Sequence, residues 1–191
     1  KKITEGQSMR NQTIKVIMHT LHEANSREKV HAERVSKLCR IIGKAMKLEE
    51  EVLKELELTG LMHDIGKIAI NSNILDKPGK LTEAEYEEIK RHPEISYHIL
   101  KSADVYTRLA EYVLSHHERW DGKGYPLGIS GEDIPILSRI LAVADAYDAM
   151  IESRVYRKAL SKEEALNEIK KNSGTQFDPT VSSIFIEILN F

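Results

Sequence analysis

The sequence predicts an all-α fold: a single helical domain preceded by an N-terminal signalling or linker helix. Apolar residues recur at intervals of three and four in most segments, as on the buried face of a helix. No segment of any length alternates apolar and polar residues as a half-buried strand would. The 191 residues suffice for one sizeable core but not comfortably for two domains. We therefore expect a linker helix over residues 1–25 and one domain over residues 26–191.

Three helices are expected before a loop at Pro78-Gly79. An apolar stripe predicts the first helix over residues 7–24, and Ser26 is expected to cap a second helix that ends near residue 46. The third helix is expected over residues 49–63. The first helix could pack on its own domain or dimerise with its copy, and the pattern leaves both readings open.

Capping residues divide the second half of the chain. Thr82 and Glu85 form a capping-box pattern, and Asp178 with Pro179 leads into the last helix. The apolar segment over residues 136–151 follows a loop rich in glycine and proline and is expected to be central in the fold. The remaining helices are expected to begin at Pro93 and to cover residues 105–116 and 180–189.

The composition excludes some functions. Hydrophobic residues make up 41% and charged residues 30% of the chain, as in ordinary globular proteins. A formal net charge of -2 argues against a nucleic-acid polymer or a membrane surface as the main partner. The single cysteine, Cys39, cannot form an intramolecular disulfide. We found neither a signal peptide nor a membrane span, which predicts a cytoplasmic protein. The chain does not begin with Met, so we expect an excised domain whose upstream sensor is missing.

Histidines beside carboxylates carry the chemistry. His63 and Asp64 end an apolar helix, where two buried polar groups are costly unless a partner such as a metal ion satisfies both. The adjacent His116 and His117 also lie at a helix end, and Asp145 lies in an apolar segment where its carboxylate requires a cation. Taken alone, each could be structural: His31 a hydrogen-bonded core residue, His92 a helix-start residue, and Asp145 a buried cap or the partner of Arg139.

Together these motifs resemble a known family. In order and spacing, the chain is similar to the HD-GYP subfamily of the HD phosphohydrolase superfamily over about residues 30–185. The motifs that carry the resemblance are "HDIGK" at 63–67, "HP" at 92–93, "HHERWDGKGYP" at 116–126 and "RILAVADAYDAM" at 139–150. The resemblance implies an all-α phosphodiesterase that binds two or three transition metals, usually including iron, and hydrolyses cyclic di-GMP.

The resemblance also assigns the site residues. One metal would be held by His31, His63, Asp64 and Asp145. Asp64 would bridge to a second metal, completed by His92, His116 and His117. Iron is the expected metal, with manganese, nickel and zinc as alternatives. Glu118 is expected to orient a histidine ring. Asp64 and Lys67 would be catalytic, and substrate contacts are expected from Lys67, Gly124, Tyr125, Asp148, Arg154 and Arg157.

The implied reaction opens cyclic di-GMP to linear pGpG, with GMP as a further product, through a water activated by two metals. Two readings compete with it: a non-catalytic output module that binds a cyclic dinucleotide or a diguanylate cyclase, and a phosphohydrolase acting on another nucleotide such as cyclic GMP-AMP. Members with three metals carry a glutamate four residues before the first histidine. That position is Arg27 here, which predicts two metals, and Glu28 is the one residue that could substitute.

Overall fold

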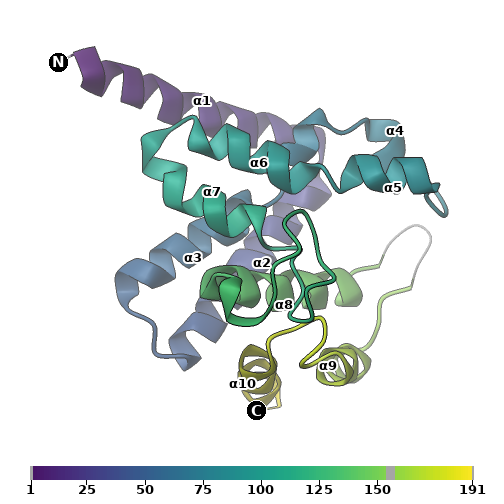
Figure 1. Cartoon of the computed structure of the whole chain (residues 1–191). Helices are drawn as coiled ribbons and strands as arrows, with labels where there is room; N and C mark the ends of the chain where they lie inside the picture. Colours follow the sequence, from purple (N-terminus) through teal and green to yellow (C-terminus); the bar gives the residue numbers. More distant parts are fainter. Residues whose placement is uncertain (1, 154–157, 191) are drawn as a thin grey trace.

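The structure, a computed structural model, confirms the all-α class (Figure 1). It describes residues 2–153 and 158–190, and no strand occurs within these two ranges. The helices are α1 (Lys2–Ala24), α2 (Ser26–Ala45), α3 (Glu50–Met62), α4 (Ser72–Leu75), α5 (Glu83–Ile89), α6 (His92–Lys101), α7 (Thr107–Leu114), α8 (Ile136–Ile151), α9 (Lys162–Lys171) and α10 (Pro179–Leu189). The short 3-10 helices are η1 (Ile65–Ala69), η2 (Asp104–Tyr106) and η3 (Gly131–Asp133).

Most of the expected helix starts are correct. The Thr82 capping box begins α5, and the Asp178 carboxylate accepts hydrogen bonds from two amides at the start of α10. Ser26, however, does not cap α2: the Asn25 side chain accepts from the Glu28 amide at 3.2 Å, so Ser26 is the first helical residue. Helix α9 was not expected from the sequence, although Ser161 caps it with a second capping box.

Two apolar cores support the site from opposite sides. The first packs α2, α3, α8, α9 and α10 together around residues such as Val35, Ile140 and Phe185. The second lies under α1, η1, α6 and α7, and its buried residues include Leu100 and Val113. Figure 1 shows α8 in the middle of the molecule, with α9 and α10 on one side and the α6–α7 pair on the other. The elements that carry the predicted ligands meet between these cores.

Helix α1 packs on the domain through its second half. Ile14 and Leu21 are buried, and Ile14 belongs to the second core. Of the two readings that the sequence left open, this contact agrees with packing of α1 on its own domain, while its dimerisation stays a prediction. Within residues 2–153 and 158–190, no helix has both the length and the hydropathy needed to span a bilayer.

Candidate metal centre

The fold brings all seven predicted metal ligands together from five separate segments. His31 lies on α2, His92 begins α6, and Asp145 lies on α8. His63 and Asp64 follow α3, whereas His116 and His117 follow α7. Potential donor atoms lie within 4.8 Å of one another in three groups: His31, His63 and Asp64; His92, His116 and His117; and His63, His116 and Asp145.

Three of the histidines are oriented in the same way. Nδ1 of His63, His92 and His116 lies 2.8, 2.7 and 2.6 Å from the backbone carbonyl three residues earlier. A carbonyl only accepts, so Nδ1 must carry the proton in each ring and donate it. The lone pair is then on Nε2, which faces the cluster. Backbone at three helix ends therefore fixes the tautomer that a metal ligand requires.

Asp64 lies between two sets of imidazole nitrogens. Its Oδ2 is 3.0 Å from His63 Nε2 and 3.9 Å from His31 Nε2. Its Oδ1 is 3.2 Å from His92 Nε2. Each carboxylate oxygen thus faces a different half of the cluster, which is the arrangement that bridging two cations requires.

His31 is oriented by a carboxylate instead of a carbonyl. Its Nε2 lies 3.1 Å from Asp145 Oδ1, and its Nδ1 lies 2.7 Å from Asp148 Oδ2. Asp148 is fully buried and also accepts hydrogen bonds from Arg34 at 2.6 and 2.8 Å. The expectation that Asp148 contacts substrate is therefore corrected: its carboxylate is occupied behind His31, where it orients the ring.

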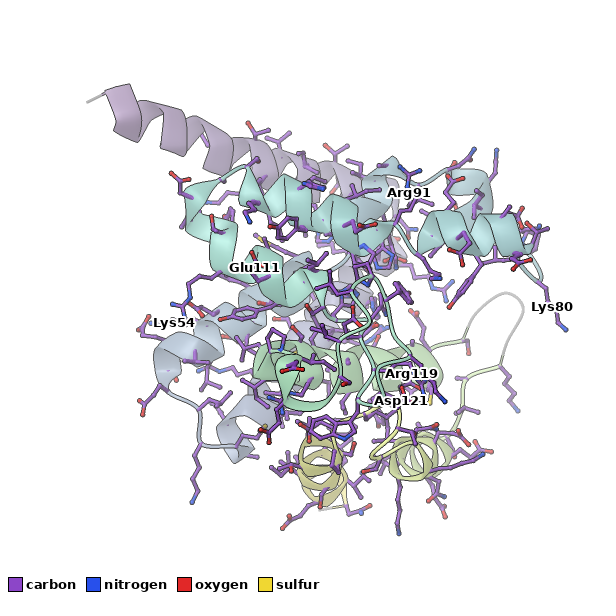
Figure 2. The ribbon with its side chains drawn as sticks, viewed as in Figure 1. Lys54, Lys80, Arg91, Glu111, Arg119 and Asp121 are labelled. Atoms are coloured by element: carbon purple, nitrogen blue, oxygen red, sulfur yellow. The ribbon has the colours of Figure 1, made fainter. Side chains whose placement is uncertain are left out.

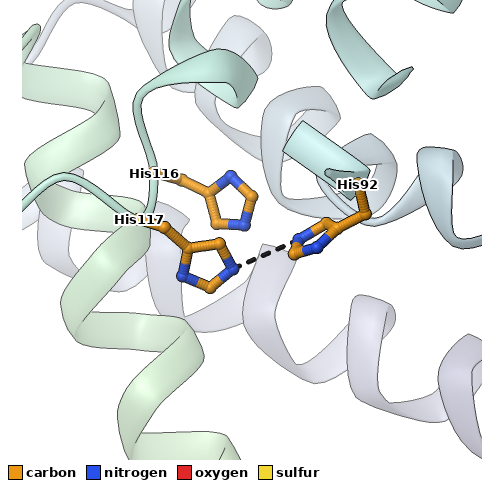
Figure 3. Close-up of side chains that lie close together, drawn as sticks. All are labelled: His92, His116 and His117. Carbon is orange, nitrogen blue, oxygen red and sulfur yellow. Dashed lines mark hydrogen bonds between the residues drawn. The ribbon is translucent and has the colours of Figure 1, made fainter. Parts of the chain in front are cut away.

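The second group of histidines is compact (Figure 3). His117 Nε2 lies 3.2 Å from His92 Nε2, and the His116 and His117 ring centroids are 3.9 Å apart. Tyr125 stacks on His117 with ring centroids 4.9 Å apart and an interplanar angle of 23°. The loop that follows the two histidines therefore folds back onto them and holds the His117 ring in place.

The electrostatics of the cluster favour a cation. Burial alone would lower the pKa of His31, but the Asp145 and Asp148 carboxylates raise it to about 10. Burial and the imidazole of His92 lower the pKa of His117 to about 4. His117 therefore stays neutral near pH 7, the form in which an imidazole binds a metal. Burial opposes the charge of Asp64 as well, yet the ammonium of Lys67 beside it helps to hold the pKa of Asp64 well below the usual range.

Two buried nitrogens test whether a metal fits. The Nε2 atoms of His63 and His116 are buried and have no hydrogen-bond partner. With their protons on Nδ1, both nitrogens present lone pairs, and the His63 lone pair lies 3.0 Å from a carboxylate oxygen. Buried lone pairs placed together are costly unless a cation lies among them. The imidazole and carboxylate donors suit iron, manganese, nickel or zinc.

Sequence reasoning missed two residues that align the ligands. The Ser96 hydroxyl accepts from the Gly66 amide at 2.8 Å and donates to the His63 carbonyl at 3.1 Å. A Cβ on Gly66 would lie 2.2 Å from the His92 carbonyl oxygen, so α6 packs directly against the η1 backbone. The available signal was the spacing of His92 and Ser96, one turn apart on α6.

The loop after His117 corrects two further expectations. Glu118 is buried, and its Oε1 accepts from the amides of Leu127 and Gly128 at 2.6 and 3.2 Å, so it anchors the loop instead of orienting a histidine. A Cβ on Gly124 would lie 2.4 Å from the Arg119 amide nitrogen. Gly124 is therefore needed for backbone packing, and it is not among the residues that line the cavity described below. In the same loop, Figure 2 shows Arg119 beside Asp121. The Arg119 guanidinium donates hydrogen bonds of 3.0 and 2.8 Å to the two carboxylate oxygens of Asp121.

A cavity of about 400 Å³ opens onto the cluster. His31, Asp64, His92 and His117 line it, together with Lys67 and Tyr125. Lys67 Nζ lies 2.7 Å from Asp64 Oδ2 and 3.0 Å from Glu28 Oε2, so its ammonium is held beside the proposed bridging carboxylate. The predicted contacts Arg154 and Arg157 lie outside the described residues.

Comparisons with known proteins show which family and which relatives this chain resembles. A family model described as an HD domain matches residues 15–181. A cyclic di-GMP phosphodiesterase from Thermotoga maritima is 42% identical, over 83% of this chain and 44% of that protein. The 3'3'-cGAMP-specific phosphodiesterase 1 of Vibrio cholerae is 43% identical, over 72% of this chain and 32% of that protein. The chain thus spans less than half the length of these two relatives.

The solved structures support the fold alone. Bd1817, described as an HDG"Y"P protein from Bdellovibrio bacteriovorus, superposes with a TM-score of 0.72 at 16% identity. The superposition covers 97% of this chain and 62% of that one. The arrangement of helices is therefore shared well beyond the reach of sequence similarity.

Proposed function

The chain belongs to the HD-domain family, and on this basis we propose that it is a metal-dependent phosphodiesterase that hydrolyses cyclic di-GMP. Relatives that cover most of this chain carry that activity in their names. The single observation that supports the proposal best is the position of Asp64, whose two oxygens face separate groups of buried imidazoles. The main product in this proposal is linear pGpG.

Two divalent ions would be held by the residues already described. One ion would be held by His31, His63, Asp64 and Asp145, and the other by Asp64, His92, His116 and His117. Iron is the first choice among the metals that this donor set suits. When bound, such a pair supplies Lewis acidity at the scissile phosphate and lowers the pKa of a coordinated water toward neutrality.

The side chains around the cluster have separate tasks. Lys67 is half-buried in the cavity wall, and its ammonium stays charged because Asp64 and Glu28 raise its pKa despite the loss of solvent. It is therefore placed to neutralise a phosphate oxygen next to Asp64. Tyr125 also lines the cavity, and burial raises the pKa of its phenol, so it contributes a neutral hydroxyl as a hydrogen-bond donor.

Two alternative functions are included in the experiments that test this proposal. A non-catalytic output module is disfavoured because all seven predicted ligands are present and gathered in one place. Cyclic GMP-AMP as substrate is favoured by one specific observation, the 43% identity to the cGAMP-specific enzyme. The expected cytoplasmic location, an upstream sensor and a diguanylate cyclase partner stay predictions.

The proposal is tested by anaerobic purification followed by loading with Fe²⁺ or Mn²⁺. Cyclic di-GMP, cyclic GMP-AMP and cyclic di-AMP are then supplied separately, and the products are separated by chromatography. Metal-dependent conversion of cyclic di-GMP to pGpG supports the proposal. Binding of cyclic di-GMP without turnover by the loaded protein would favour the output module, and faster cleavage of cyclic GMP-AMP would reassign the substrate.

We expect about two metal ions per chain, the number that a bridging carboxylate between two ligand groups accommodates. A third ion would need a donor from the start of α2. There the Arg27 guanidinium lies 3.3 Å from Glu152 and 3.1 Å from the Ser153 carbonyl, and Glu28 is paired with Lys67. A guanidinium repels a cation, and Glu28 would have to leave an ammonium to bind one.

Elemental analysis of protein purified without chelator measures this number. Glu28→Gln is the matched variant, because it removes the one carboxylate that could bind a third ion. The variant is expected to keep the metal content of the wild type. A reproducible third ion that this variant loses would contradict the two-metal assignment.

A further inference from the structure

We propose that Tyr86 on α5 is a base-stacking residue of the cavity, on whose ring one nucleobase of the cyclic dinucleotide lies. The inference rests on the proposed function and adds a residue to it. Tyr86 belongs to none of the motifs that identified the metal centre, and it lies outside the ligand set.

The exposure of Tyr86 is the first observation. The exposed fraction of Tyr86 is 50%. Within residues 2–153 and 158–190, Tyr86 is the one aromatic residue among the exposed large hydrophobic residues. The ring also lines the cavity that opens onto the metal centre. An exposed aromatic surface that lines a cavity is suited to a flat apolar ligand.

Tyr125 cannot take this role with its ring. One face of the ring is stacked on His117. The Lys90 ammonium also lies over the Tyr125 ring, 5.2 Å from its centroid. Because the His117 imidazole covers one face of this ring, the ammonium lies over the other face. The Tyr125 hydroxyl remains for the substrate, whereas a base requires an aromatic face from elsewhere.

Tyr86 is held in position next to the metal centre. The Lys90 ammonium is 5.8 Å from the Tyr86 ring centroid, so a single cation lies between the two tyrosines. Lys90 is itself fixed by Glu87 at 2.8 Å. The chain then runs from α5 directly into α6 (Figure 1). His92 Nδ1 donates to the Ile89 carbonyl at 2.7 Å. The proposed base wall and a metal ligand therefore belong to one continuous segment.

Apolar residues close to Tyr86 in the chain line the cavity with it. Leu75, Leu81 and Ile89 come, like Tyr86, from the segment between α4 and α6, whereas Asp64, Lys67 and the histidines of the lining belong to the metal centre. A cyclic dinucleotide has the matching division, with charged phosphates joined to apolar base faces. A phosphate at the metal centre would direct a base toward these apolar residues.

Stacking predicts a particular kinetic signature. Every base has a π-face, so stacking contributes about 1–3 kcal/mol per base with little regard to its identity. Removing the ring is therefore expected to raise KM for cyclic di-GMP roughly 5- to 150-fold and to raise KM for cyclic GMP-AMP similarly. The kcat and the metal content should not change, because Tyr86 is not placed at the reacting atoms.

The test compares three substitutions in the metal-loaded protein. Tyr86→Ala and Tyr86→Leu are expected to raise KM with unchanged kcat, whereas Tyr86→Phe is expected to behave as the wild type. Leucine separates stacking from simple apolar contact, and phenylalanine separates the ring from its hydroxyl. In a fourth variant, Tyr86→Trp, added pGpG is expected to quench fluorescence beyond the change seen for Trp120 in the wild type.

The outcomes distinguish this inference from the function on which it rests. An active wild type together with an unchanged KM for Tyr86→Ala would overturn base stacking and leave the proposed function intact. A Tyr86→Phe variant as impaired as Tyr86→Ala would also overturn it, because the hydroxyl would then be the important group. A metal-loaded wild type that cleaves no cyclic dinucleotide would overturn both.

Discussion

Replacing Asp64 by alanine is expected to abolish hydrolysis and to lower the metal content of a protein that stays folded. In the part of the chain that the structure describes, Asp64 is the one carboxylate whose two oxygens lie 3.0 and 3.2 Å from imidazole nitrogens of different groups, so its loss removes a ligand from both proposed ions. It also removes one of the two carboxylates that hold Lys67. Loss of a shared ligand should reduce kcat by at least about a thousandfold, as for removal of other essential catalytic groups.

The measurements are turnover of cyclic di-GMP, elemental analysis and far-UV circular dichroism of the same preparation. Asp76→Ala is the matched control, because Asp76 lines the same cavity but belongs to none of the groups of potential ligands. It should keep both activity and metal. If Asp64→Ala retains turnover close to that of the wild type, the assignment of Asp64 as a bridging ligand is wrong.

The sequence was informative where a local pattern determines the structure. Helical periodicity and the caps at Thr82 and Asp178 placed the main helices, because a cap is made by residues three or fewer positions apart. Four of the seven predicted ligands were indicated for a related reason. A histidine next to a carboxylate or another histidine, at the end of an apolar helix, has few structural explanations, and His63-Asp64 and His116-His117 are both of this kind. The full set, with His31, His92 and Asp145, was predicted only by the resemblance to a family.

The errors arose where a residue's role depends on a distant partner. Asp148 was assigned to substrate, but its carboxylate binds a histidine 117 positions away in the chain. Glu118 was assigned to a histidine ring, but it binds two amides of the loop that folds back over it. Gly124 was expected to face the nucleotide and is instead required by backbone packing. No periodicity in the sequence indicates such contacts, since they form only when helices pack.

The short helix α9 was missed for a different reason. Its ten residues are mostly charged or polar, and only Ala165, Leu166 and Ile169 are buried. A helix with so narrow an apolar face gives a weak periodic signal. Its capping box at Ser161 and Glu164 was the stronger indication. Local capping chemistry is thus more informative than hydrophobicity for a helix that only covers the edge of a core.

Replacing Gly66 by alanine is expected to destabilise the protein by about 3 kcal/mol or more and to reduce metal binding. The new Cβ would lie 2.2 Å from the His92 carbonyl oxygen and 2.6 Å from the Ser96 amide nitrogen. Both atoms are backbone, so they cannot rotate away, and α6 must move from η1. His92 and Asp64 lie on either side of this contact, so their 3.2 Å approach would be lost as well. Urea denaturation and elemental analysis measure the two effects.

Gly131→Ala separates the steric effect from the general cost of replacing a glycine. Gly131 has a φ of +56°, and nothing lies within 4 Å of the position of an added Cβ. The substitution Gly131→Ala should therefore lower the free energy of unfolding only through backbone strain, by about 1–2 kcal/mol. That variant should keep its metal. Adding Ser96→Ala to Gly66→Ala should not restore stability, because it removes the Ser96 hydroxyl and leaves both backbone contacts in place. Recovery of stability and metal in the double variant would show that the side chain, not the backbone of α6, sets the approach of His92 to Asp64.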